Sequence, residues 1–271
     1  MPILDKDMTL CISLAARPSN LGTRFHNFLY DELGLPFVYK AFAPTDIEQA
    51  IAGVRGLGIR GCSVSMPYKE AVIPLVDELT PSADRIRSVN TIVNHDGRLI
   101  AHNTDYLAVR ALLEESPLRG TGSVLLRGSG GMAKAVLAAV RDLGFEDVTL
   151  LARSEERGRP LADQYGAAWT ADATSSADLL INATPIGMAG GAHADELAFP
   201  EEAVSAASTV FDVVAVPATT PLLALAERLG KDTITGVTVT GLQAAEQFEL
   251  YTGVRPTPEA IERATAFSRA G

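Results

Sequence analysis

Short apolar runs alternate with amphipathic stretches along the first third of the chain. Apolar runs with the length of buried β-strands lie at residues 9–14, 37–42 and 59–65. After the first run, Phe25, Phe28 and Leu29 fall on one face of an expected helix. Gly34 is expected to end that helix, and Asp46 to cap the next one. Strands that alternate with helices predict the α/β class with parallel strand pairing.

Two segments depart from this alternation. Residues 66–70, Met-Pro-Tyr-Lys-Glu, leave the third strand and are expected to begin a short helix, from which a side chain can reach into a cleft. Apolar runs at 89–93 and 98–101 flank an Asp-Gly dipeptide, which predicts an antiparallel hairpin. A helix over about 106–115 follows the hairpin, and Pro117 ends it.

The second half of the chain returns to the alternating pattern. Strands are expected at 124–127, 148–152, 179–183, 209–214 and 233–236, and the last two helices at about 238–252 and 258–269. This half therefore reads as a doubly wound nucleotide-binding unit.

A glycine-rich loop lies between the strand at 124–127 and an alanine-rich helix. Its spacing, Gly-x-Gly-x-x-Ala, provides a tight turn, a backbone that phosphate can approach and a small residue where helix meets strand. The free N–H groups of the helix start would face the anion. The alternative is a simple glycine-rich turn. We predict a cofactor-binding loop formed by Gly128, Ser129, Gly130, Gly131, Met132 and Ala133.

The next strand ends in Arg153 instead of the acid that would bind a ribose 2′-hydroxyl. An arginine at this position suits a 2′-phosphate and therefore favours NADP over NAD. Arg157 lies one helical turn further and can share the phosphate if Glu155 and Glu156 point away. For both arginines the alternative is a solvated helix start.

Arg127 and Lys134 flank the glycine loop. A cation in the first turn of a helix is unfavourable against the helix dipole unless an anion offsets it. We expect one of these two side chains to face the pyrophosphate, and the alternative is that both extend into solvent.

The composition restricts the class of partner. With 271 residues, 47% hydrophobic residues and a mean hydropathy of +0.15, the chain is expected to fold into one large or two medium buried domains. A net charge of −10 argues against nucleic acid or an acidic membrane as partner. The expected partner is a small molecule, and the expected state is a monomer or homodimer.

Cysteine and histidine usage indicates neither a disulfide nor a metal site. Cys11 and Cys62 lie in apolar runs without metal-ligand spacing and are expected to be buried free thiols. The four histidines are scattered, so no metal is expected. The N-terminus carries acids where a secretory signal has a basic start, and no apolar stretch reaches about 18 residues. These features predict a cytoplasmic protein.

Six motifs along the chain resemble those of the shikimate dehydrogenase family. They are Val64-Ser65-Met66-Pro67-Tyr68-Lys69-Glu70, Val89-Asn90-Thr91, Asn103-Thr104-Asp105, Gly128-Ser129-Gly130-Gly131, Ile181-Asn182-Ala183-Thr184-Pro185-Ile186-Gly187-Met188 and Gln243-Ala244-Ala245. The resemblance covers essentially the whole chain. It implies an α/β substrate-binding and catalytic domain (residues 1–104 plus 237–271) and a Rossmann NADP-binding domain (residues 105–236).

The resemblance also implies an activity and site residues. The activity is reversible hydride transfer between NADP and a ring hydroxyl of shikimate or a related acid, as in aromatic amino acid biosynthesis by the chorismate pathway. Lys69 and Asp105 match the catalytic pair. The implied substrate-binding positions are Asn20, Ser63, Ser65, Asn90 and Gln243, and Thr184, Met188 and Gly236 join the cofactor-binding set.

Elementary chemistry agrees with the implied pair. Oxidation of an alcohol requires a base for the hydroxyl proton while the cofactor takes the hydride. A lysine is a usable base only when its pKa lies well below about 10.4. Burial favours the neutral amine and a carboxylate neighbour favours the charged form, so we expect Asp105 to orient Lys69 and the substrate hydroxyl. The alternatives are that Lys69 is a solvated lysine at a helix start and that Asp105 is a simple helix cap.

The chain departs from the family pattern at several substrate positions. Asn20 and Gly22 stand where the family usually has a pair of serines, Ser63 where asparagine is usual, and Ala215 where tyrosine is usual. These departures resemble the shikimate dehydrogenase-like subfamily and predict weak recognition of shikimate. The open alternatives are a quinate or other ring-acid dehydrogenase, and a nucleotide-sensing protein with little turnover.

Overall fold

The computed structural model describes residues 4–118 and 120–270 and divides the chain into two compact units. The first comprises Met1–Leu107 and Gly241–Gly271, and the second Ala108–Thr240. Both divisions fall within helices, namely α4 (Thr104–Glu115) and α9 (Gly236–Thr252). The boundaries expected near 104 and 237 lie in the same two helices, a few residues earlier.

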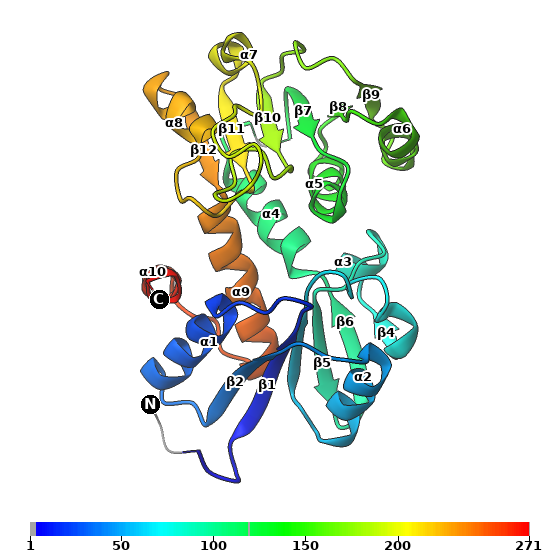
Figure 1. Ribbon diagram of the computed structural model, residues 1–271, viewed down its shortest axis with the longest axis vertical. Coiled ribbons are helices and arrows are strands. Elements are labelled where there is room, and N and C mark those ends of the chain that lie inside the picture. The colour runs from blue at the N-terminus through cyan, green and yellow to red at the C-terminus, as the bar shows by residue number, and fades with distance from the viewer. Residues whose placement is uncertain (1–3, 119, 271) are drawn as a thin grey trace. The chain divides into compact units, whose positions relative to one another are not determined.

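The first unit contains a mixed six-stranded sheet in the order β2-β1-β3-β5-β6-β4 (Figure 1). Its strands are β1 (Thr9–Leu14), β2 (Phe37–Phe42), β3 (Gly61–Val64), β4 (Glu78–Leu79), β5 (Thr91–His95) and β6 (Arg98–His102). β1 pairs in parallel with β2 and β3, whereas β5 is antiparallel to β3 and β6. The predicted hairpin is confirmed: Asp96 and Gly97 both have positive φ (52° and 92°), as a tight two-residue turn requires.

Helices cover both faces of this sheet. They are α1 (Leu21–Glu32), α2 (Ile47–Gly56), α3 (Pro81–Asp84) and α10 (Pro258–Arg269), together with part of α9. The side chains of α1, α9 and α10 pack with Cys11 on one face, and those of α2 and α3 pack with Cys62 on the other. The two thiols are buried and free, as predicted, and the sheet itself separates them.

The prediction of a short helix beginning at residues 66–70 is wrong. The chain instead makes successive turns after β3, followed only by the three-residue 3₁₀ helix η1 (Ile73–Leu75). Pro74 contributes to this, because its ring would clash with the carbonyl of Glu70 in a helix continuing from residues 66–70.

The second unit is built on a six-stranded, fully parallel sheet in the order β12-β11-β10-β7-β8-β9 (Figure 1). Its strands are β7 (Ser123–Arg127), β8 (Asp147–Leu151), β9 (Ala168–Thr170), β10 (Leu179–Asn182), β11 (Thr209–Asp212) and β12 (Asp232–Thr235). Its helices are α5 (Gly131–Asp142), α6 (Glu155–Gln164), α7 (Glu201–Ala206) and α8 (Pro221–Arg228). The strand order reverses between β7 and β10, and such a switch point is where doubly wound folds bind ligands.

Within the described parts of the chain, no helix is both long and apolar enough to cross a membrane.

Candidate functional site

The glycine loop lies at the switch point of the parallel sheet, directly after β7. Gly128 has φ +128°, and a Cβ there would lie 2.8 Å from the carbonyl oxygen of Ala183, which follows β10. Glycine is thus required by both the backbone angle and the space. Gly130 caps α5 without any side chain, which leaves the first N–H groups of a twelve-residue helix open to a ligand. This geometry suits an anionic group.

Arg127 and Arg153 lie at the carboxyl ends of the neighbouring strands β7 and β8. Partial burial, with repulsion from Arg153, lowers the pKa of Arg127. The Arg127 guanidinium donates a hydrogen bond to the carbonyl of Ala198. Its head is therefore engaged by the protein, and it remains a prediction that Arg127 or Lys134 contacts a pyrophosphate.

Arg153 and Arg157 are exposed at the start of α6, and neither forms a hydrogen bond or ion pair with residues in 4–118 or 120–270. Glu155, which had to point away from them, pairs with Arg159, whose Nε lies 2.8 Å from Oε1. The Arg159 guanidinium also lies 4.8 Å from the centre of the Trp169 ring. Arg153 and Arg157 thus remain available to an external anion.

A buried carboxylate organises the loops at the ends of β10 and β11. Asp212 accepts hydrogen bonds from Asn182 Nδ2 (2.9 Å), the backbone N of Val214 (3.0 Å) and Thr220 Oγ1 (2.7 Å). Burial raises the pKa of Asp212, and these three donors oppose the rise. The hydroxyl of Thr184 in turn donates to Asn182 Oδ1 at 2.6 Å. Thr184, an expected cofactor residue, is therefore held by a network that ends at Asp212.

Met188 and Gly236 are the two remaining expected cofactor positions. Met188 is 41% exposed. A Cβ at Gly236 would lie 2.4 Å from the backbone of Val214, so only glycine fits at the beginning of α9.

Lys69 and Asp105, the expected catalytic pair, lie together in the first unit. Lys69 Nζ donates to Asp105 Oδ2 at 2.6 Å, and the two side chains are 27% and 12% exposed. Lys69 sits in the turns after β3, where its carbonyl accepts a hydrogen bond from the backbone N of Val89. Asp105 lies in the first turn of α4, a favourable place for an acid. The pair is partly buried and still accessible to a small molecule.

The start of α4 is fixed by buried amides. Asn103 Oδ1 accepts from the backbone N of Tyr106 (3.0 Å), and Asn90 Oδ1 accepts from that of Thr104 (2.8 Å). Asn90 Nδ2 donates to the Thr104 hydroxyl, which lies 3.5 Å from Oε1 of Gln243. Two expected substrate positions, Asn90 and Gln243, thus belong to the network that carries Asp105.

The other expected substrate positions lie around the start of α1 and the end of β3. Asn20 is exposed and does not cap α1 with its side chain, and Ser65 is also exposed. A Cβ at Gly22 would lie 3.6 Å from the Tyr39 hydroxyl. Burial raises the pKa of Tyr39, and hydrogen bonds with Ser13 and Ser63 oppose this. The serine at 63 is therefore partly engaged within the protein.

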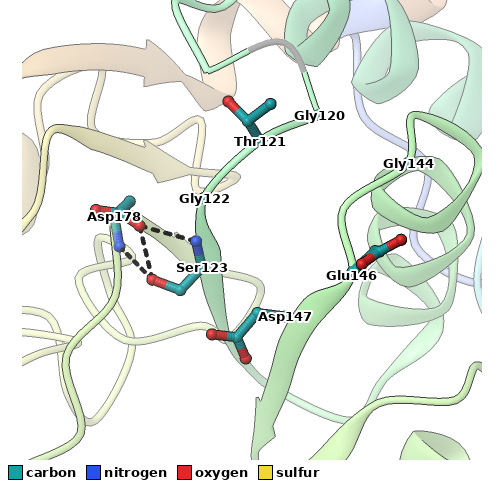
Figure 2. A pocket seen from close by; sticks show the side chains of 8 residues that line it. All are labelled: Gly120, Thr121, Gly122, Ser123, Gly144, Glu146, Asp147 and Asp178. Carbon is teal, nitrogen blue, oxygen red and sulfur yellow. Dashed lines mark hydrogen bonds between the residues drawn. The ribbon is translucent and has the colours of Figure 1, made fainter.

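A separate hollow of about 560 Å³ opens at the amino ends of β7 and β8 (Figure 2). Glu146, Asp147 and Asp178 contribute its acidic lining, and Asp178 accepts hydrogen bonds from both the backbone N and the hydroxyl of Ser123. This hollow lies at the opposite end of the strands from the glycine loop, and none of the expected site residues lines it.

The described residues contain no group of three or more His, Cys, Asp or Glu side chains arranged to hold a metal ion.

Two polar features were missed by sequence reasoning. The Asn182–Asp212 pair ends two fully buried apolar strands, and Gln247 is a buried amide in an otherwise apolar helix face. In both cases the available signal was a polar residue inside a buried apolar pattern.

The fold and these residues define an α/β protein whose second unit has the strand order of dinucleotide-binding domains and whose first unit carries a lysine–aspartate pair. Residues 19–92 match the family model described as the shikimate dehydrogenase substrate binding domain. Over 268 residues the chain is 53% identical to the shikimate dehydrogenase-like protein of Haemophilus influenzae, covering 98% of this chain and 99% of that protein. The chain belongs to the shikimate dehydrogenase family.

Further comparisons agree with this membership. The chain is 37% identical over 257 residues to the NADP(+) shikimate dehydrogenase of Thermococcus kodakarensis, covering 90% of each. A solved shikimate 5-dehydrogenase-like protein matches with a TM-score of 0.97 at 53% identity, over 99% of this chain and all of the other. Shikimate 5-dehydrogenase from Thermus thermophilus, in complex with NADP(H) and shikimate, matches with a TM-score of 0.86 at 29% identity, over 96% of this chain and 100% of that one. Quinate dehydrogenase from Corynebacterium glutamicum, in complex with NAD, matches with a TM-score of 0.85 at 27% identity, over 96% of this chain and 98% of that one.

Proposed function

We propose that this chain is an NADP-dependent oxidoreductase that interconverts shikimate, or a closely related hydroxylated ring acid, and its 3-dehydro ketone. The observation that carries the proposal is the Lys69–Asp105 pair, with 2.6 Å between Nζ and Oδ2. Family membership supports it, since relatives are named as NADP(+) shikimate dehydrogenases. Residues 1–104 plus 237–271 would bind substrate, and residues 105–236 would bind NADP.

The residues of the second unit fit a dinucleotide. The pyrophosphate would lie against the glycine loop and the first turn of α5, formed by Gly128, Ser129, Gly130, Gly131, Met132 and Ala133. Arg153 and Arg157, which lack internal partners among the described residues, would hold a 2′-phosphate. Thr184, Met188 and Gly236 would surround the nicotinamide. Bound NADP would supply the hydride acceptor.

Lys69 would handle the proton of the reaction. In the oxidation direction, the O–H proton of the substrate passes to the neutral Lys69 amine. The hydrogen on the same carbon leaves with its electron pair, and the C–O single bond becomes the C=O bond of the ketone. In the reverse direction, Lys69 returns a proton to the ketone oxygen. Asp105 would hold the amine and the substrate hydroxyl in line, as its short contact with Nζ supports.

Substrate recognition is proposed to be weak for shikimate. Asn20, Ser63, Ser65, Asn90 and Gln243 are the proposed contacts. The amide oxygen of Asn90 already accepts hydrogen bonds from Thr91 and Thr104 within the protein, which limits what it can offer a ligand. Each missing hydrogen bond to a charged carboxylate costs roughly 1.5–3 kcal/mol.

A panel of ring acids, assayed by NADPH absorbance, tests the proposal. We expect shikimate to be oxidised with a high KM and a kcat/KM below about 10⁴ M⁻¹s⁻¹. A value in the ordinary enzyme range would contradict weak recognition, and no turnover of any ring acid would contradict the function itself.

A second candidate substrate is quinate, favoured by the structural match to a quinate dehydrogenase. A nucleotide-sensing role with little turnover is the remaining alternative. It is disfavoured because a sensor needs no proton-transfer pair such as Lys69 and Asp105. A cytoplasmic location, a monomeric or homodimeric state and a role in aromatic amino acid biosynthesis by the chorismate pathway complete the proposal.

A further inference from the structure

Gln247 is a buried amide on α9, and it is 3% exposed. Its neighbours one turn away on the helix, Ala244 and Tyr251, are buried and mostly apolar. Burial of an amide is unfavourable unless hydrogen bonds compensate for its lost hydration. The partners of Gln247 therefore explain why an amide is tolerated at this position.

The Gln247 Nε2 atom lies between acceptors from two strands of the first unit. It donates to Thr91 Oγ1 at 3.0 Å, and the carbonyl of Asn90 and the hydroxyl of Ser63 each lie at 3.3 Å. Helix α9 is thereby joined to the end of β3 and the beginning of β5 through one side chain.

The direction of the next hydrogen bonds follows from the amide groups, whose nitrogens only donate and whose oxygens only accept. The amide nitrogen of Gln247 can only donate, so Thr91 Oγ1 accepts from it, and the Thr91 hydroxyl donates to Asn90 Oδ1 at 2.8 Å because that oxygen can only accept. Asn90 Oδ1 also accepts from the backbone N of Thr104, and Asn90 Nδ2 donates to the Thr104 hydroxyl at 3.0 Å. Hydrogen bonds donated in one direction thus lead from Gln247 through Thr91 and Asn90 to the Thr104 hydroxyl, and the Thr104 backbone N–H donates back to Asn90.

The residue after Thr104 is Asp105, whose carboxylate holds Lys69. A rotation of the Asn90 amide would remove the only side-chain acceptor of the Thr104 backbone N–H among the described hydrogen bonds. The first turn of α4 would then loosen at the position from which Asp105 extends.

We propose that Gln247 is a positioning residue for this enzyme: through Thr91 and Asn90 it holds the first turn of α4 so that Asp105 meets Lys69. The inference rests on the proposed function, because that function gives the pair its catalytic role. Gln247 itself touches none of the reacting atoms.

The test compares Gln247→Met, which keeps the volume and removes the donors, with wild type. We expect kcat to fall about tenfold or more and NADP affinity to stay unchanged; KM should change less than kcat, although Asn90 and Ser63 are also proposed substrate contacts. Thr91→Val removes the next member of the series and should act in the same way. The double variant should be no slower than the slower single variant, because both changes break one path. Gln164→Met, on the exposed surface of α6, is the matched control and should behave as wild type.

A second measurement requires no substrate. Hydrogen exchange of the amides at residues 104–106 should be at least about tenfold faster in Gln247→Met than in wild type. Unchanged exchange would overturn the inference, as would faster exchange with normal kcat. Faster exchange in a chain that oxidises no ring acid would leave the positioning of Asp105 supported and would refute only the proposed function.

Discussion

His26 gives the most quantitative prediction, because the structure buries its ring completely. The ring is stacked on Tyr39 with 4.4 Å between centroids, and neither ring nitrogen has a hydrogen-bond partner among the described residues. Burial lowers the pKa of His26 to about 3, from an ordinary value of 6.5, and the adjacent Gln247 side chain opposes this only in part. The folded state therefore keeps this histidine neutral well into the acid range.

The sign of the pH effect follows from proton binding. The unfolded chain takes up a proton at His26 as the pH falls below about 6.5, whereas the folded chain does so only near 3. The stability associated with neutral His26 is complete above about 6.5 and is lost as the pH falls towards about 3. One pKa unit corresponds to about 1.4 kcal/mol, so the loss between pH 7 and pH 4.5 amounts to about 2.5 kcal/mol.

The variant His26→Phe removes the titrating group and keeps a stacked ring. We expect the difference in unfolding free energy between pH 7 and pH 4.5 to be smaller in the variant by about 2.5 kcal/mol. Urea denaturation followed by circular dichroism measures it. The fluorescence of Trp169, the single tryptophan, reports on the second unit separately. His193→Phe, which removes an exposed histidine, is the control. Its difference in unfolding free energy between pH 7 and pH 4.5 should stay within about 0.5 kcal/mol of the wild-type difference. An equal pH dependence in wild type and His26→Phe would refute a neutral buried imidazole.

Two further predictions concern the proposed sites. Arg153→Ala should weaken NADP binding roughly tenfold to a hundredfold while barely changing NAD binding, since a charge-assisted phosphate contact contributes on the order of 1.5–3 kcal/mol; calorimetric titration with both cofactors measures this, and equal losses would contradict it. Lys69→Ala and Asp105→Asn should each lower turnover by a factor on the order of 10² or more without changing cofactor affinity, and near-normal turnover in both would assign the proton step to another group.

Local sequence patterns predicted most of the fold. Apolar runs predicted the strands at 9–14 and 37–42 with the bounds that β1 and β2 have, because a buried strand needs a continuous apolar run. The Asp-Gly dipeptide marked the β5–β6 hairpin for an equally local reason. By contrast, β9 has three residues and α7 six, and neither is long enough to produce a recognisable period.

The candidate site was predicted less completely, because its geometry depends on contacts between distant segments. Lys69 and Asp105 were expected to act together from motif resemblance, and their 2.6 Å contact depends on turns that sequence reasoning assigned to a helix. The role of Asn90 in holding Thr104 depends on residues 14 positions apart. Gln247 lies more than 150 positions from Thr91, and no local rule relates them.

The glycine that the switch point requires has a consequence for how the proposed cofactor preference can change during evolution. At Gly128 a positive φ and a carbonyl oxygen 2.8 Å from any added Cβ leave no room for a side chain, so a substitution at this position would disrupt the backbone itself. Arg153 and Arg157 are exposed and carry no structural hydrogen bonds among the described residues. Their replacement would leave the fold intact. With the 2′-phosphate role proposed for Arg153 and Arg157, exposed substitutions after β8 would change the preference between NADP and NAD while Gly128 stays fixed.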